Sequence, residues 1–227
     1  MGLTVDKEIF KRAPKLNVGV LIIVGMDNSA DISGFVKKEY SIIEEKVRSK
    51  FDGIELSEYP VVKIWREIYK GFGEKKARSS LESLIRRVAG GKGIYSINPL
   101  VDIYNLASLT FELPCGGEDT DVMASGLTLT FADGSESFTP LGETVIERPN
   151  EGEIIYKFGD TVVCRNFNYR ESDVTKLTDR TKNAIIIFED ALGDKENLQA
   201  ALNWVGDKAV SLLGAESVSS SIISNTV

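Results

Sequence analysis

The chain has 227 residues, enough for one large domain or two small ones and for a sizeable core without stabilising cross-links. Its composition, with 42% hydrophobic and 27% charged residues, is typical of a globular protein, and its net charge of −7 argues against a general nucleic-acid binder. The sequence contains no histidine, which excludes histidine-based triads, histidine general bases and histidine-rich metal sites.

Two features bear on where the protein resides. Cys115 and Cys164 cannot form a disulfide framework, so we expect reduced thiols in a cytoplasmic protein. The early apolar run VGVLIIV at 18–24 is far shorter than the ~20 residues of a membrane span and is typical of a buried strand. We therefore expect no membrane partner, and the residues suggest neither a metal nor a cofactor.

Helical spacing dominates the first half of the chain. In chain order, the patterns predict a short helix at 8–12, a strand at 17–24, a helix at 32–50, a helix capped by Ser57 that ends near 71–73, a helix opened by Ser79 or Ser80 and closed by Gly90-Gly91, and a helix at 98–113 that starts at Asn98-Pro99.

Strand-like patterns follow. They predict a hairpin around Asp133-Gly134, two strands around Gly159-Asp160, a strand at 183–192 and a closing helix at 194–213, with a serine-rich tail at 216–227 that frays. The interpretation is one α+β domain at 1–215, in which a helical part at 1–113 precedes a β-rich core at 114–192.

The helix at 98–113 leads into an unusual stretch, in which Pro114, Gly116 and Gly117 precede a cluster of acids, Glu118, Asp119 and Asp121. Glycines let the backbone approach a ligand closely, and carboxylates accept hydrogen bonds from an ammonium group or from hydroxyls. The alternative is a helix stop followed by a solvated acidic loop.

A second unusual stretch is VVCRNFNYRES at 162–172. As a strand, it would place Asn166, Asn168 and Arg170 on one face and Arg165, Phe167 and Tyr169 on the other. Arginines and amides beside aromatic rings suit phosphate, carboxylate or base contacts. Alternatively, the arginines of an edge strand pair with Glu171 or Asp173.

A third feature is a basic segment between Lys63 and Lys92, with nine basic and three acidic residues, so that +6 stands against −13 in the remaining chain. This contrast favours a phosphate-binding patch, although a solvated helix face also explains it. The candidate RNA-binding residues are Arg66, Lys70, Lys75, Lys76, Arg78, Arg86 and Arg87.

Three segments together resemble a known family: VDIYNLASLTFELPCGGEDTD, GLTLTFADGSESFTPLG and GEIIYKFGDTVVCRNFNYRESDVTKLTDRT. They are similar to the B3/4 domain of the phenylalanyl-tRNA synthetase beta subunit, and more closely to free-standing B3/4-domain proteins. The resemblance spans about 60–190. It implies a mixed, partly barrel-like β-sheet core flanked by helices.

The resemblance also implies a function. In the synthetase, the pocket of this domain hydrolyses tRNA charged with the wrong amino acid, and free-standing relatives are suspected trans-editing or tRNA-binding proteins. Asn105 matches the family's VDxxN motif, and Pro114 and Asp119 match the following turn. Gly116 stands where the synthetase has a histidine. Asn168, Tyr169 and Arg170 replace its Gly-Gly-Glu, and Glu171 comes one residue later.

The resemblance therefore suggests an aminoacyl-tRNA deacylase, an ester hydrolase whose partner is the aminoacylated 3′ end of a tRNA. The expected roles are oxyanion binding by Gly116, Gly117 and Asn166; ammonium binding by Glu118 or Asp119; substrate contact by Asn105; phosphate contacts by Arg165 and Arg170; and water positioning by Ser108 or Thr181.

Two alternatives stay open, so the sequence does not decide whether the protein is an enzyme. One is a non-catalytic tRNA- or RNA-binding module, and the other is a binder of a free amino acid or amine. No DNA partner is expected, and the oligomeric state is not indicated. The deacylase hypothesis expects the glycine bend and the 165–170 strand to form two walls of one cavity, wide enough for an acylated adenosine.

Overall fold

The computed structural model describes residues 2–225. The helices are α1 (Lys7–Arg12), α2 (Ser33–Phe51), α3 (Pro60–Gly71), α4 (Ser80–Ala89), α5 (Pro99–Phe111) and α6 (Lys195–Leu213), with short 3₁₀ turns at Leu56–Glu58 and Thr120–Val122. The strands are β1 (Leu3–Val5), β2 (Asn17–Val24), β3 (Cys115–Asp119), β4 (Leu127–Phe131), β5 (Ile154–Phe158), β6 (Thr161–Arg165), β7 (Arg170–Glu171), β8 (Ala184–Asp190) and β9 (Ser217–Ser224).

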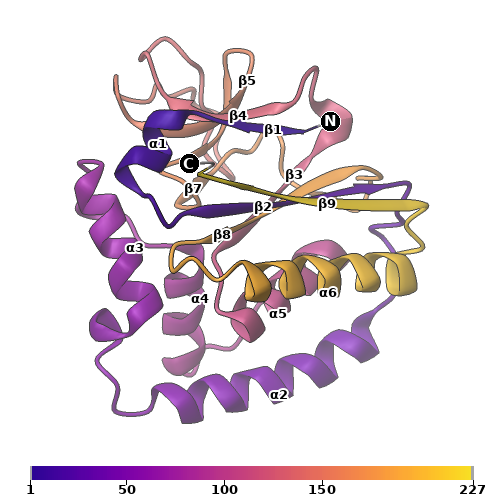
Figure 1. Ribbon diagram of the computed structural model, residues 1–227. Helices are drawn as coiled ribbons and strands as arrows, with labels where there is room; N and C mark the ends of the chain where they lie inside the picture. Colours follow the sequence, from indigo (N-terminus) through magenta and orange to yellow (C-terminus); the bar gives the residue numbers. More distant parts are fainter. Residues whose placement is uncertain (1, 226–227) are drawn as a thin grey trace.

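The strands form two sheets, which lie one above the other in Figure 1. The upper sheet has the order β1-β4-β5-β6-β7 and the lower one β3-β8-β2-β9. Helices α5 and α6 cover the free face of the lower sheet, and α2 forms a further layer beneath them. The predicted α+β class, with a mixed sheet core flanked by helices, is confirmed, although neither sheet closes into a barrel within residues 2–225.

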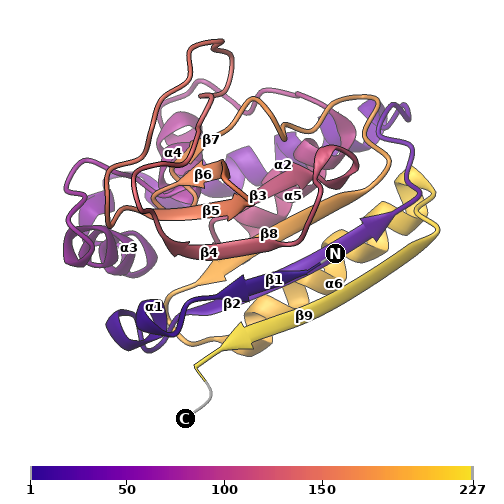
Figure 2. The same cartoon turned by 90° about the horizontal axis from the view of Figure 1, so that it is seen from above.

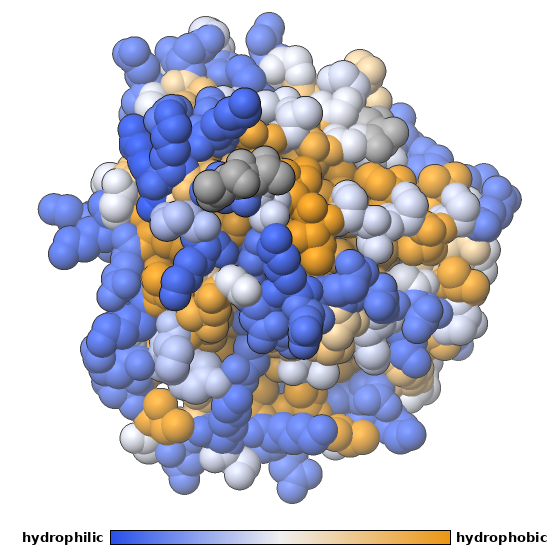
Figure 3. Space-filling view, viewed as in Figure 1, coloured by the Kyte–Doolittle hydropathy of each residue, from blue (hydrophilic) through white to orange (hydrophobic). Residues whose placement is uncertain are grey.

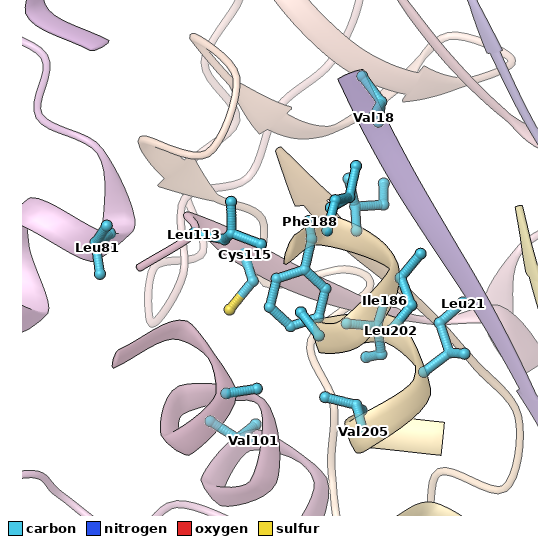
Figure 4. Packing of buried hydrophobic residues seen from close by; sticks show 14 of the residues in the cluster. Val18, Leu21, Leu81, Val101, Leu113, Cys115, Ile186, Phe188, Leu202 and Val205 are labelled. Atoms are coloured by element: carbon cyan, nitrogen blue, oxygen red, sulfur yellow. The ribbon is translucent and has the colours of Figure 1, made fainter. Parts of the chain in front are cut away.

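Strand β8 is the centre of the core. Every residue of its sequence AIIIFED is buried, because neighbouring strands, helices and the upper sheet enclose it. Its antiparallel partner β2 is nearly as apolar, and Val20 pairs with Ile187. Figure 4 shows Phe188 pointing from β8 toward α6, with Leu202 and Val205 close by. A fully buried strand has a continuous apolar run, which is why the sequence predicts both strands.

Of the three helix starts predicted from a capping residue, two are confirmed. The Asn98 side chain accepts a hydrogen bond from the Val101 amide at 3.2 Å, and the Ser79 hydroxyl accepts from the Glu82 amide at 3.1 Å. The predicted Ser57 cap is wrong, because Ser57 lies in a 3₁₀ turn and α3 begins at Pro60. Proline favours the first helical position, where its missing N–H costs no hydrogen bond.

The predicted hairpin around Asp133-Gly134 is wrong. Strand β4 pairs with β5, which lies beyond the long loop at 132–153. The two amides of Asp133 and Gly134 instead donate to the buried carboxylate of Glu136, so the turn closes on a side chain. The two strands predicted around Gly159-Asp160 are confirmed as β5 and β6, which pair antiparallel.

The predicted frayed tail is wrong for Ser217–Ser224, which form β9. This strand pairs antiparallel with β2 along its whole length. Several of its serines are exposed, while Val218 and Ile222 pack against the core. Serine-rich composition suggested disorder, but three aliphatic residues supply enough apolar contact to hold the strand on the sheet. Within the described residues, no helix has the length and apolarity that crossing a bilayer requires.

Candidate functional site

The segment predicted as a glycine bend is strand β3, at the edge of the lower sheet. Gly116 pairs with Ile187 and Gly117 with Ile186. A β-carbon on Gly117 would lie 2.6 Å from Cδ1 of Ile186, and one on Gly116 would lie 2.7 Å from Oε1 of Glu171. Because neither glycine has a side chain, Ile186 and Glu171 can occupy the space beside them. The expectation of a solvated acidic loop is also wrong, because Glu118 and Asp119 are buried.

The segment predicted as one strand at 162–172 is a hairpin. Strand β6 ends at Arg165 and β7 begins at Arg170, so the predicted two-face alternation of 165–170 is wrong. Asn166 and Phe167 have positive backbone φ values of 52° and 57°, which residues other than glycine rarely adopt. The buried Phe167 ring, in edge contact with Trp65 at 5.4 Å between centroids, anchors this strained turn to α3.

These two segments do converge, and they border a small hollow between the two sheets. We call it the carboxyl hollow; its lining residues are Gly116, Glu118, Tyr156, Cys164, Phe167, Asn168, Glu171, Ile187 and Glu189. Figure 2 shows β3 and β8 beneath the β5–β6–β7 edge of the upper sheet. Its volume is about 20 Å³, which is room for roughly one water molecule. The expected width for an acylated adenosine is not present.

Two of the hollow's three carboxyl groups are tied to neighbouring side chains. Glu189 accepts from the Tyr156 hydroxyl at 2.6 Å and from the Asn168 amide nitrogen, and these bonds join the two sheets. Glu118 accepts from the Thr175 hydroxyl. The third carboxyl, that of Glu171, faces the space left beside Gly116. The hollow thus gathers acids from both sheets, and no lysine or arginine of residues 2–225 lines it.

Burial shifts the acidity of all three groups. It raises the pKa of Glu171 to about 7 and that of Glu189 to about 7. It also raises the pKa of Glu118, with repulsion from Glu171 as the next cause. Desolvation disfavours the charged form, and neighbouring carboxylates add to this effect. Near neutral pH Glu171 and Glu189 therefore exchange protons readily, which is what a general acid or base requires.

A larger and open groove lies between α3 and the segment 74–78 that leads to α4. We call it the basic groove; its volume is about 650 Å³ and its lining residues are Arg66, Tyr69, Lys70, Glu74, Lys75, Lys76, Ala77 and Arg78. Among the described residues, Lys70, Lys75 and Lys76 form no ion pair. Hydrophilic residues dominate the margins of the face in Figure 3, including the left margin, where α3 lies in Figure 1.

Glu82 holds the arginines beside this groove. Its buried carboxylate receives Arg66 at 2.6 Å and Arg86 at 2.8 Å, and Arg78 lies 3.9 Å away. Burial alone would raise the pKa of Glu82, but the hydrogen bonds from Arg66 and Arg86 hold it below its usual value. The arginines are thus fixed in place, while the three lysines keep their charge for another partner.

The groove and the hollow share a wall. Tyr69, a residue that is 2% exposed, belongs to the groove lining, and its hydroxyl donates to Oδ1 of Asn168 at 3.3 Å. The same oxygen accepts from the Ser80 amide at 2.7 Å, and the Asn168 amide nitrogen donates to Glu189. A chain of hydrogen bonds therefore runs from the groove lining to the buried Glu189. Five of the seven predicted RNA-binding residues line the groove, while Arg86 pairs with Glu82 and Arg87 stacks on Tyr95 at 3.5 Å.

The two predicted phosphate contacts, Arg165 and Arg170, are neutralised elsewhere. Arg165 bonds Glu153 through two nitrogens, at 2.6 and 2.7 Å, and Glu147 at 2.7 Å. Arg170 bonds both oxygens of Glu147, at 2.9 and 3.0 Å. Their partners are thus Glu147 and Glu153, rather than the acids next to them in sequence. Neither arginine lines the hollow.

Several other predicted site residues are engaged elsewhere too. The Ser108 hydroxyl donates to the Leu113 carbonyl at 2.7 Å, the Thr181 hydroxyl donates to Asp119, and the Asn166 amide donates to Glu153 at 3.2 Å. Asn105 lies half-buried in α5. Of the predicted catalytic and substrate-binding residues, Gly116 and Glu118 line the hollow.

Sequence reasoning missed most of the lining, including Tyr156, Cys164, Glu171 and Glu189. One signal was available, because Glu189 follows the apolar run AIIIF directly and continues a fully buried strand. A carboxyl in such a position needs a specific partner or a proton.

Comparison with known proteins gives a family and several similar solved structures. The B3/4 domain family matches residues 64–198. No curated protein shows a significant match to the chain. A solved structure, an N-terminal fragment of the phenylalanyl-tRNA synthetase beta subunit from Pyrococcus horikoshii, is similar with a TM-score of 0.48 and 13% sequence identity. The similarity covers 96% of this chain and 50% of that fragment. This chain therefore spans about half of the fragment's length.

Proposed function

This chain belongs to the B3/4 domain family, and from that premise we propose that it binds tRNA. The phosphates of the RNA lie along the basic groove, and the aminoacylated 3′ end points toward the carboxyl hollow. One observation carries the proposal: three lysines line a groove whose wall, Tyr69, contacts the Asn168 that bonds the buried acids.

The charge distribution supports the first part of the proposal. Lys70, Lys75 and Lys76 bring positive charge to one open groove on a chain whose net charge is −7. When lysines neutralise phosphates, the nucleic acid releases its bound counterions, so the affinity falls steeply as the salt concentration rises. The negative remainder of the surface repels RNA and confines it to the groove.

The finer proposal is that the bound tRNA is deacylated when it carries the wrong amino acid. Glu171 takes a proton from a water molecule that attacks the ester carbonyl carbon; the bond from that carbon to the ribose oxygen breaks, and the ribose hydroxyl leaves with a proton. Glu118 and Glu189 hold the α-ammonium group. The amino acid enters only when the hollow, whose volume is about 20 Å³, widens.

A second candidate function is tRNA binding without hydrolysis. The volume of the hollow, about 20 Å³, favours it, because no acyl group fits in the closed form. It requires the same lysines and leaves the carboxyl groups without a chemical role. The two candidates therefore differ in turnover and not in affinity.

The test measures deacylation of a panel of mischarged tRNAs, and tRNA affinity as a function of salt. Replacing Lys70, Lys75 and Lys76 by glutamine should weaken binding and reduce the slope of log K against log salt by about 0.7–0.9 for each phosphate that is no longer neutralised. Glu171→Gln should abolish turnover and leave binding intact. Lys37 and Lys38, exposed on α2, replaced by glutamine, are the matched control.

The outcomes separate the hypotheses. Salt-dependent binding without ester loss for any tRNA rejects the hydrolase and retains the binding module. If tRNA does not bind, and free amino acids instead raise the melting temperature, the protein is a small-molecule binder.

A further inference from the structure

Five large apolar side chains are exposed near one end of the upper sheet. We call them the apolar ledge; they are Leu141, Val145, Ile146, Tyr169 and Val174, with exposed fractions of 56, 67, 67, 40 and 46%. Single exposed apolar residues are common, but a gathering of this kind marks an interaction surface. Its residues come from the loop at 132–153 and from the chain around β7.

Backbone contacts bring these two segments together. The Leu141 amide donates to the Glu171 carbonyl at 3.0 Å, Pro140 pairs with Ser172, and the Gly142 amide donates to Asp173 at 2.9 Å. Further along, Glu147 bonds Arg170. The loop from 140 to 147 therefore runs beside 170–173, and its exposed apolar residues lie next to Tyr169.

Tyr169 directly follows, in the chain, a residue that belongs to the lining of the carboxyl hollow. Its neighbour Asn168 lines the hollow and contacts Tyr69, the aromatic wall of the groove. Tyr169 is therefore one residue away from the contact that joins the lining of the groove to that of the hollow.

The Tyr169 ring sits on a rigid base. On one side, Phe167 is buried among aromatic rings, and Asn168 is held by three hydrogen bonds. On the other side, Arg170 is fixed by its two bonds to Glu147. An exposed ring on a fixed backbone loses little conformational entropy when a flat partner stacks on it.

We propose that the apolar ledge, with Tyr169 at its centre, accepts the bases of a single-stranded RNA segment whose phosphates lie in the basic groove. The inference rests on the proposed function and adds how the unpaired end is held. Base–aromatic stacking next to a cationic groove is a common arrangement in single-strand binding, and it is tolerant of sequence.

The chemistry of the ledge favours bases over further phosphate contacts. Its adjacent arginine, Arg170, is neutralised by Glu147, so the ledge offers apolar area more than charge. The continuity with the groove through Tyr69 favours RNA over a protein partner, because the same strand can occupy both surfaces.

The test compares two single strands of equal length, one with bases and one abasic. Tyr169→Ala should weaken binding of the base-bearing strand about 5- to 150-fold and leave the abasic strand unchanged. Tyr169→Phe should keep the affinity, because stacking needs the ring and not the hydroxyl. A 2-aminopurine at the 3′ end should be quenched by wild type and not by Tyr169→Ala.

Two further variants sharpen the result. The double variant Val145→Ser/Ile146→Ser, at exposed loop positions, should also weaken only the base-bearing strand. Tyr95→Ala, an exposed tyrosine already stacked by Arg87, should change nothing.

Each other outcome overturns the inference. If the abasic strand binds with a normal salt slope and Tyr169→Ala has no effect, the groove function stands and the ledge assignment falls. If both strands lose affinity equally, Tyr169 does not act on bases. If the loop variants alter self-association instead of RNA affinity, the ledge is a protein contact. If neither strand binds wild type, both proposals fall together.

Discussion

The hydroxyl of Tyr69 lies 3.3 Å from Oδ1 of Asn168, and the amide nitrogen of that same side chain donates to Glu189. One asparagine thus joins the wall of the basic groove to the buried acids. A displacement of Tyr69 or of Glu189 therefore acts on the other residue through the Asn168 side chain.

Asn168→Ala should destabilise the fold and change the acidity of the hollow. The substitution leaves the Tyr69 hydroxyl, the Ser80 amide and one oxygen of Glu189 without partners, at a cost of roughly 2–4 kcal/mol of unfolding free energy. Tyr69→Phe removes one of these bonds and should cost about 1 kcal/mol. Urea denaturation measures both; equal costs for the two variants would contradict this network.

Stability should fall as the pH rises from about 4.5 to about 7. Glu171 and Glu189 have folded-state pKa values of about 7, above the unfolded value of 4.5, so in this range the native state binds more protons. The free energy of unfolding therefore decreases with pH until both groups are ionised.

Glu171→Gln should reduce this dependence. The variant should gain on the order of 2 kcal/mol relative to wild type at about pH 8 and little at about pH 4. Denaturant titrations at both pH values, with the exposed Glu45→Gln as control, measure the effect. A gain that does not depend on pH would contradict the assignment.

Phe167 and Tyr169 are two residues apart, but replacing them by alanine should have very different effects on the free energy of unfolding. Phe167→Ala removes a buried ring that packs on Trp65 and Phe72, and should cost about 3–5 kcal/mol. Tyr169→Ala should change stability by less than about 0.5 kcal/mol, because that ring is exposed. Thermal or urea unfolding distinguishes them, and a large cost for Tyr169→Ala would place its ring in the core.

The adjacent glycines of β3, Gly116 and Gly117, should also differ in how much their replacement by alanine lowers stability. Gly117→Ala forces a methyl group to within 2.6 Å of Ile186 and 3.1 Å of Tyr104 in the packed core, and should cost about 1–3 kcal/mol. Gly116→Ala meets only the flexible end of Glu171, so it should preserve stability and displace that carboxylate. The proposed turnover should then fall while folding stays normal; the reverse order of stability would contradict this packing.

Elements with one strong local pattern were predictable from the sequence. The buried strands β2 and β8 show continuous apolar runs, and the start of α5 is marked by Asn98-Pro99. Strand partners were not predictable, because β4 pairs with a segment that lies beyond a long loop. Nothing local in Asp133-Gly134 distinguishes a hairpin turn from a loop entrance.

The candidate site was predictable at the level of segments and not of side chains. The stretches around Gly116 and Asn168 do meet, as expected, and the basic segment does form a groove. The error was to treat 165–170 as a continuous strand. The positive φ values of Asn166 and Phe167 reverse the chain there, send Phe167 into the core and leave Tyr169 outside. Asparagine is among the non-glycine residues that adopt this backbone conformation most often, but a bulky phenylalanine gives no such signal.

Strand β9 has a practical consequence for expression. Its pairing covers the outer edge of β2, whose sequence NVGVLIIV carries no charge. A clone that stops near residue 215, where the serine-rich composition suggests a boundary, would present that edge as an uncapped template for pairing between molecules. Such a clone should precipitate, and its failure would be an artefact of where the gene was cut.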